Sequence, residues 1–268
     1  MRTNNVKAKL HRGEVSPGAW LSVANIATAR LMSRVGFDWL TVDCEHTAQT
    51  PDLMAAMVAI IADSQTCAPL VRVPTNSVEW FKWALDAGAW GVIVPMVNTR
   101  EEAERAVSWC KYPTLGTRSI GGAFAQYAFG TNSRAEYAAA ANNEIMVIIQ
   151  IESPTAIENL DEILSVPGID VAFVGPNDLH ALLGLSPSSE GAEPEFVAAM
   201  ETLKAAGKRH NVPLGIYCSN GEAALQRTRE GFQMVTTTSD AACLASASAQ
   251  NLLDFRSHRS SEKKIELR

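Results

Sequence analysis

The sequence lacks the features that mark several classes of protein. It has no apolar run long enough to span a bilayer, and no apolar signal region follows its first residue. Lys and Arg number 23 against 29 Asp and Glu, and the net charge of −6 argues against nucleic acid as the main partner. The five cysteines form no Cys-x-x-Cys pair, so we interpret them as reduced residues. We expect a cytoplasmic protein whose partners include neither a membrane nor a nucleic acid.

What the sequence does contain is a series of apolar segments that alternate with helical patterns. Eight segments have the largely apolar composition of buried strands: residues 18–23, 38–45, 68–74, 91–97, 145–152, 170–178, 213–218 and 233–238. None has the polar character of the edge strands that an open sheet would expose. Eight strands that alternate with helices over 268 residues predict an α/β fold, a closed (β/α)₈ TIM barrel in a single domain.

Two parts of the chain depart from this repeat. Residues 112–143 are too many for a plain connection, and we predict a functional loop there with a short helix. We expect the barrel, with a lead-in helix at its start, to occupy residues 1–255. Residues 256–268 are charged and nearly without large apolar side chains, which predicts a polar, mobile tail.

Two neighbouring strand segments lead into carboxylates, Glu152 and Asp178. Ligands of parallel barrels bind beyond the carboxyl ends of the strands, so we expect both side chains in one mouth. Two carboxylates there repel each other unless a cation or a proton lies between them, and oxygen ligands suit Mg²⁺ or Mn²⁺. The alternative is that both are ordinary polar residues at strand ends.

Two further side chains at strand ends are candidates for chemistry. His46 follows the second strand, where it is suited to acid–base work near neutral pH, with Asp43 close enough in sequence to orient its ring. Arg72 interrupts an apolar strand, where it is suited to pairing with a substrate carboxylate or a developing enolate. The alternatives are a solvated loop histidine and an internal ion pair of Arg72 with Glu45 or Glu152.

Weaker signals surround these residues. The turn Gly175-Pro176-Asn177-Asp178 has backbone N–H groups suited to holding a carboxylate. Trp20, on the first strand, either lines the pocket or packs in the core. His180 follows Asp178 closely and is a further candidate for the mouth. The strands carry no Lys, so a Schiff-base mechanism has no candidate residue.

Seven short motifs together resemble the HpcH/HpaI aldolase family, in order from about Gly18 to Ala249. They lie at residues 18–22, 36–39, 43–46, 71–74, 85–89, 150–152 and 174–179. The family consists of metal-dependent class II pyruvate aldolases, with macrophomate synthase as a relative. The resemblance therefore implies a lyase that acts on small 2-oxo acids and aldehydes.

The resemblance also implies roles for the candidate residues. Glu152 and Asp178 would hold a divalent metal, Mg²⁺, Mn²⁺ or Co²⁺. Arg72 would stabilise the enolate oxygen, and His46, held by an acidic partner, would move a proton. The pyruvyl unit would be fixed by Gln150 and by the turn at Gly175 and Pro176.

Asp86 matches an acidic residue of the family, but it precedes the fourth strand. We therefore expect it at the amino-terminal end of the strands in its own barrel, opposite the predicted site. The resemblance implies that it serves a neighbouring subunit, in a homo-oligomer (a hexamer or a trimer) that exchanges its last helices. The pair Arg118-Ser119 stands where the family often has Arg-Gly, Arg30 stands where it often has Glu, and residues 120–130 are unusual. These departures leave the aldehyde acceptor open.

The resulting functional hypothesis is a carbon–carbon lyase that forms or cleaves the bond between a pyruvate enolate and an aldehyde, with 4-hydroxy-2-oxo acids as substrates. The alternative enzyme is an oxaloacetate decarboxylase, or an enzyme like macrophomate synthase, that uses the same enolate. A rival of another class is a catalytically inactive barrel with a binding role.

Overall fold

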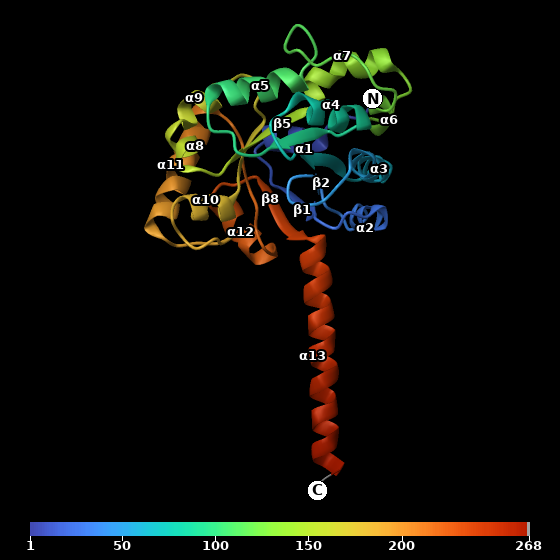
Figure 1. The fold of residues 1–268 in the computed structure, drawn as a ribbon, viewed down its shortest axis with the longest axis vertical. Helices are drawn as coiled ribbons and strands as arrows, with labels where there is room; N and C mark the ends of the chain where they lie inside the picture. Colours follow the sequence, from blue (N-terminus) through green and yellow to red (C-terminus); the bar gives the residue numbers. More distant parts are fainter. Residues whose placement is uncertain (267–268) are drawn as a thin grey trace.

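The computed structural model describes residues 1–266, with side chains described for residues 1–257. Eight parallel strands close into a barrel, in which each strand pairs with the next and β8 returns to β1 (Figure 1). The strands are β1 Ser16–Leu21, β2 Trp39–Asp43, β3 Ala68–Arg72, β4 Gly91–Val94, β5 Met146–Ile151, β6 Val171–Val174, β7 Leu214–Ile216 and β8 Met234–Ser239. The predicted (β/α)₈ barrel is confirmed.

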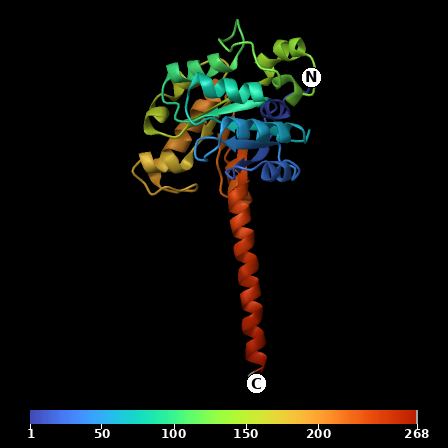
Figure 2. The ribbon, with the colours of Figure 1, turned by 45° about the vertical axis from the view of Figure 1, so that its right-hand side comes forward.

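Helices cover the outside of the barrel, apart from the last one, α13, which projects away from it (Figures 1 and 2). In the described part of the chain they are α1 Asn5–His11, α2 Ile26–Met32, α3 Pro51–Ala62, α4 Val78–Ala87, α5 Arg100–Cys110, α6 Ala125–Ala128, α7 Arg134–Glu144, α8 Pro154–Glu158, α9 Leu160–Leu164, α10 Pro176–Leu182, α11 Pro194–His210, α12 Gly221–Arg229 and α13 Asp240–Glu266. The lead-in helix α1 is tied to the barrel by an ion pair of 2.8 Å between Lys7 and Asp170.

Local sequence signals set several helix ends. Thr99 and Glu102 form a capping box at the start of α5, and Asn25 accepts the first N–H groups of α2. Pro51 stands in the first turn of α3, where its missing N–H group has no intrahelical partner to lose. Helix α4 ends at Gly88, whose φ of 104° lies in the left-handed region that glycine adopts at little steric cost.

Two features of the structure differ from the sequence prediction. The predicted strand over residues 170–178 ends at Val174, because Pro176 begins helix α10. Between β5 and β6 the chain forms two short helices, α8 and α9, that meet at Asn159. Helix α12 was not predicted.

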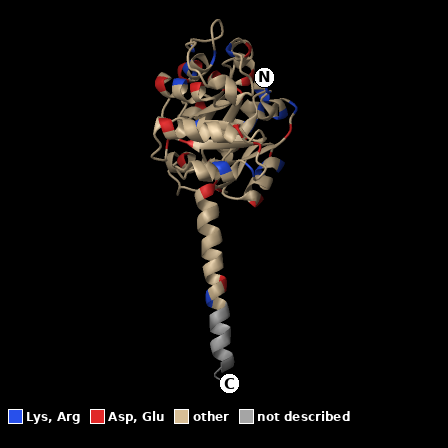
Figure 3. Ribbon diagram, turned by 90° about the vertical axis from the view of Figure 1, so that its right-hand side faces the viewer, with Lys and Arg blue, Asp and Glu red and all other residues tan. Residues whose placement is uncertain are grey.

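The last helix, α13, projects from the barrel as a rod (Figures 1 and 2). Its described part carries few charged residues, whereas Lys, Arg, Asp and Glu are spread over the barrel (Figure 3). The predicted tail continues α13 as far as Glu266, while residues 267–268 lie outside the described residues, so its mobility stays a prediction. None of the described helices combines the length and apolarity needed to cross a bilayer. Large apolar side chains are nevertheless exposed along α13: Leu244, Leu252, Leu253 and Phe255.

Candidate active site

A pocket of about 390 Å³ opens where the strands end at their carboxyl termini. A larger cavity, about 650 Å³, lies at the opposite end of the barrel, beside the starts of β6, β7 and β8, but it contains no predicted site residue. The smaller pocket is therefore the candidate site. Its lining includes nine of the ten predicted site residues: Trp20, Asp43, His46, Arg72, Gln150, Glu152, Gly175, Pro176 and Asp178.

Glu152 follows β5 directly and is only 2% exposed. One carboxylate oxygen accepts the backbone N–H of Met96 at 2.7 Å, and the other accepts the side-chain amide of Gln150 at 2.5 Å. A side chain at position 175 would begin 2.0 Å from Glu152 Oε2, so only glycine fits at Gly175. The backbone of Met96, which donates this N–H to Glu152, has a left-handed φ of 53°. That conformation is strained for a residue with a side chain.

Asp178 lies in the first turn of α10 and not at a strand end as predicted. Its side chain nevertheless lines the same pocket as Glu152, because α10 begins immediately beyond β6, the neighbour of β5. Burial raises the pKa of Glu152 to about 7, and the charges of Glu45 and Asp178 add to this effect. The pocket thus concentrates negative charge that favours either a proton or a cation.

Arg72 ends β3 and is held by two acids. It donates to both oxygens of Asp43, at 2.9 and 2.6 Å, and pairs with Glu45 at 2.9 Å. Its guanidinium also lies 5.0 Å from the ring centre of Trp20. Burial alone would raise the pKa of Asp43, but the hydrogen bonds and charge of Arg72 lower it below its usual value. The expected internal pair with Glu45 therefore exists, and a stronger one with Asp43 accompanies it.

The prediction that Asp43 orients the ring of His46 is wrong in this structure. Both oxygens of Asp43 bind Arg72, and Asp43 otherwise accepts the backbone N–H groups of Glu45 and His46. The His46 side chain is 62% exposed, and its Nε2 lies 3.9 Å from Glu45 Oε2. Glu45 is thus the acid nearest the ring, and the ring remains accessible to the pocket.

Comparisons with known proteins identify the family of the chain. The family model described as HpcH/HpaI aldolase/citrate lyase matches residues 17–247. The chain belongs to this family. A hydroxypyruvate/pyruvate aldolase from Paraburkholderia phytofirmans is 33% identical over 260 residues, covering 95% of this chain and 98% of the relative. A 5-keto-4-deoxy-D-glucarate aldolase from Salmonella newport is 35% identical over 256 residues, covering 94% and 96%.

Solved structures of similar proteins have the same fold as this chain. A HpcH/HpaI family protein from Burkholderia cenocepacia has a TM-score of 0.87 at 33% identity, covering 95% of this chain and all of that one. Macrophomate synthase has a TM-score of 0.84 at 22% identity, covering 96% of this chain and 90% of its own, a likeness of fold alone. The predictions of family and of a carbon–carbon lyase are confirmed.

The tenth predicted site residue of this family member, Asp86, does not line the pocket of its own chain. It lies near the end of α4 and pairs at 3.2 Å with Arg118, whose guanidinium lies 4.5 Å from the ring centre of Tyr112. Arg118 also donates to the hydroxyl of Tyr137, on α7. The predicted loop over residues 112–143 therefore contains two helices, α6 and α7, and a buried guanidinium.

Several lining residues of the HpcH/HpaI pocket were not predicted. Ser22, Tyr217 and Ser239 each stand at or just after the end of a strand, and Asn177 lies within a motif already singled out. Examining every residue at a strand end would have found the first three, and examining the whole motif would have found Asn177. Ser189 has no such signal, because it lies in the middle of the connection between α10 and α11.

The donors in the pocket fit a hard divalent cation. Glu152 and Asp178 supply carboxylate oxygens, and the buried Gln150 Oε1 has no hydrogen-bond partner. Among the described residues no group of three or more His, Cys, Asp and Glu side chains is arranged to hold a metal. A cation here would therefore take its remaining ligands from water and substrate, which is typical of Mg²⁺ sites.

Proposed function

We propose that the protein is a divalent-metal-dependent class II aldolase that joins a pyruvate enolate to an aldehyde and catalyses the reverse cleavage. One observation carries the proposal: a single pocket contains the Glu152–Asp178 pair, a fixed guanidinium and an exposed imidazole. The names of the relatives support a 2-oxo acid donor, since one is a hydroxypyruvate/pyruvate aldolase.

Glu152 and Asp178 would hold Mg²⁺, Mn²⁺ or Co²⁺. When bound, the ion would draw electron density from the keto oxygen of pyruvate and so acidify its methyl protons. Gln150, whose side-chain amide donates to Glu152, and the turn at Gly175 and Pro176 would orient the pyruvyl group.

Arg72 would stabilise the negative charge that develops on the enolate oxygen. Asp43 and Glu45 hold its guanidinium in one orientation, so little reorganisation is needed as the charge forms. In aldol addition, His46 would take a proton from the methyl group of pyruvate and give it to the new aldol oxygen; in cleavage, it would take the proton from the aldol hydroxyl and return it to the enolate carbon. Its exposure, with Glu45 as its nearest acid, suits a group that exchanges protons with solvent.

We further propose that the protein is a homo-oligomer, a hexamer in the first instance, that works in the cytoplasm. Two observations support assembly. The apolar side chains exposed along α13 are large enough to need a partner surface, and Asp86 lies outside the pocket of its own chain. Cytoplasmic location remains a prediction from cysteines, which are all free thiols in the structure.

Chelation tests the proposal directly. Exhaustive EDTA treatment should abolish deuterium exchange into the methyl group of pyruvate, and Mg²⁺, Mn²⁺ or Co²⁺ should restore it. Oxaloacetate decarboxylation, which reaches the same enolate by losing CO₂, should follow the same metal dependence. Full exchange in the chelated protein would exclude class II chemistry.

A further inference from the structure

We propose that His180 is a positioning residue: it fixes the first turn of α10 and so holds the carboxylate of Asp178 in the orientation that a divalent metal requires. This inference rests on the metal-dependent function proposed above and assigns a role to a residue outside the pocket. His180, a sequence candidate for the mouth, does not line the pocket, and its side chain is fully buried. Its influence on a metal is therefore carried by α10.

The two proposed metal ligands are held in different ways. Glu152 is buried, and its two oxygens accept hydrogen bonds from Met96 and Gln150. Asp178 is exposed, and among residues 1–257 no hydrogen bond or ion pair holds its carboxylate. The direction of the Asp178 side chain is thus set by the backbone of α10 alone. Whatever fixes this helix also fixes the second metal ligand.

Helix α10 is too short to be stable without contacts from the rest of the protein. It has seven residues, and Gly175 at its start provides no side-chain cap. Helices of this length are marginal in water and depend on tertiary packing. Three of its residues are buried, Pro176, Leu179 and His180, and of these only His180 has polar atoms in its side chain. A directional contact from the interior of α10 must therefore come from His180.

The ring of His180 joins the first turn of α10 to α11. Its Nδ1 lies 2.6 Å from the carbonyl oxygen of Pro176, and because a carbonyl can only accept, Nδ1 is the donor. The ring also stacks on Phe196 of α11, with the ring centres 3.9 Å apart. Asp178 lies between Pro176 and His180 in the same helical turn. A ring fixed on Phe196 therefore fixes the turn from which Asp178 projects.

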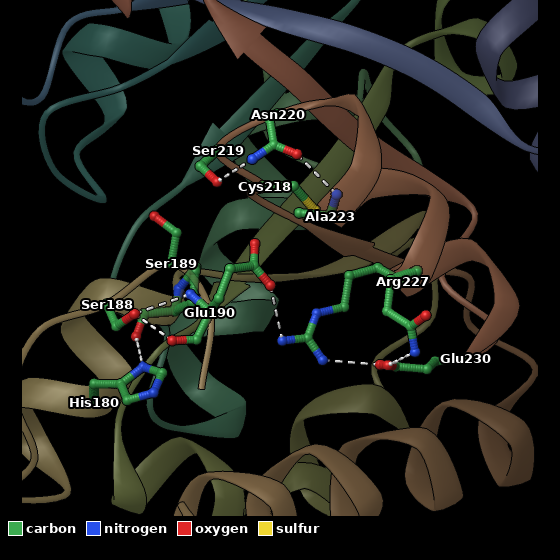
Figure 4. Close-up of polar contacts among 12 residues, drawn as sticks. His180, Ser188, Ser189, Glu190, Cys218, Ser219, Asn220, Ala223, Arg227 and Glu230 are labelled. Carbon is green, nitrogen blue, oxygen red and sulfur yellow. Dashed lines mark hydrogen bonds and ion pairs between the residues drawn. The ribbon is translucent and has the colours of Figure 1, made fainter. Parts of the chain in front are cut away.

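The connection between α10 and α11 holds the ring from its other edge. Glu193 Oε2 lies 3.5 Å from Nε2 of the ring, and a side chain at Gly191 would overlap that nitrogen. Glu190 pairs at 3.3 Å with Arg227 of α12, and in Figure 4 Glu190 lies between Arg227 and His180. The segment is thus held against the ring from the side of α12, and the ring keeps its hydrogen bond to Pro176.

Two substitutions separate the hydrogen bond of His180 from its packing. His180→Asn keeps a side-chain amide that can donate to the carbonyl four residues earlier, but it loses the stack on Phe196. His180→Leu keeps apolar contact with Phe196 and loses the donor. Two quantities are measured on each protein after EDTA treatment: the affinity for Mn²⁺ by calorimetric titration without substrate, and the midpoint of urea unfolding without metal.

Affinity and stability should change in opposite order. His180→Leu should lower the affinity for Mn²⁺ about tenfold, the low end of the range for residues that orient metal ligands. His180→Asn should keep most of the affinity and have the lower urea midpoint of the two. A role in packing alone would make the less stable variant the weaker binder. The matched control is His210→Leu, at the far end of α11, where His210 contacts Asp161 at 2.7 Å; it should keep the wild-type affinity.

The possible results separate the inference from the function on which it rests. Wild-type affinity in His180→Leu would overturn the inference, and so would an equal loss in His210→Leu. A marked loss of affinity in folded His180→Asn would overturn it as well, whatever His180→Leu does, because the donor alone would then not position Asp178. If the wild-type protein itself binds no Mn²⁺, the proposed metal-dependent function is wrong.

Discussion

The proton on Glu152 should control both the stability of the metal-free protein and its affinity for metal. Its carboxyl group is buried between the strands, and its pKa of about 7 lies above the ordinary value of 4.5. Between pH 4.5 and 7 the folded protein therefore binds more protons than the unfolded chain does. The free energy of unfolding must fall as pH rises through this window, and the loss is complete above pH 7.

The size of the effect follows from the two pKa values. Their difference corresponds to about 3 kcal/mol for ionised Glu152 above pH 7. Glu152→Gln removes this charge and keeps the shape, since Met96 can still donate to its oxygen. Rotation of the Gln150 amide would present its unpaired Oε1 to the new amide group. The variant should therefore be the more stable protein at pH 8, without metal, by up to about 3 kcal/mol, and the difference should shrink toward pH 5.

Urea unfolding of the EDTA-treated proteins at pH 5, 6, 7 and 8 measures this difference, with Glu162→Gln on the exposed surface of α9 as the control. Calorimetric titration of the wild type with Mn²⁺ gives an independent reading. Its affinity should rise about tenfold from pH 6 to pH 8, because a proton must leave Glu152 before metal binds. Parallel pH profiles for wild type and Glu152→Gln would refute the reasoning, since Glu152 would then ionise in its ordinary range.

Two further predictions concern catalysis and assembly. Arg72→Lys should lower both oxaloacetate decarboxylation and pyruvate exchange by about 10², whereas His46→Ala should lower exchange by roughly 10²–10⁴ and spare decarboxylation. Lysine is the better test at Arg72, because alanine would leave the buried Asp43 and the partly buried Glu45 unpaired. Equal losses in both assays for His46→Ala would mean that His46 is not the base. Replacing Leu252 and Leu253 on α13 by Asp should shift the protein to smaller species in light scattering, and an unchanged mass would contradict the proposed role of this helix.

The barrel was predictable because its strands are buried on both faces. All six residues of β5 and all four of β6 are buried, which produces the continuous apolar runs seen in the sequence. Helix α12 escaped prediction because a glycine stands in its first turn and only two of its nine residues, Ala224 and Arg227, are buried. An apolar stripe that narrow gives little periodic signal.

Which residues form the site was easier to predict from the sequence than which of them contact one another. Asp43 was assigned to His46 because the two lie three residues apart, but Asp43 stands directly opposite Arg72 in the pairing of β2 with β3. That register depends on contacts between strands, which a single strand does not encode. Side chains in register on neighbouring strands lie close enough for a bidentate ion pair. Arg72 therefore occupies both oxygens of Asp43, and neither is left to contact the imidazole of His46.

The same register explains why the guanidinium of Arg72 keeps one position in a pocket that contains several carboxylates. Asp43 binds two of the nitrogens of Arg72 and Glu45 the third, so the group is anchored from the side of β2 and cannot follow a substrate. Glu152, directly after β5, is anchored separately by Met96 and Gln150. Arg72 and Glu152 therefore have separate sets of fixed partners, and neither needs the other as its partner. The proposed 2-oxo acid would fit this arrangement, since its keto oxygen, which becomes the enolate oxygen, could meet both the guanidinium and a cation held by Glu152 and Asp178.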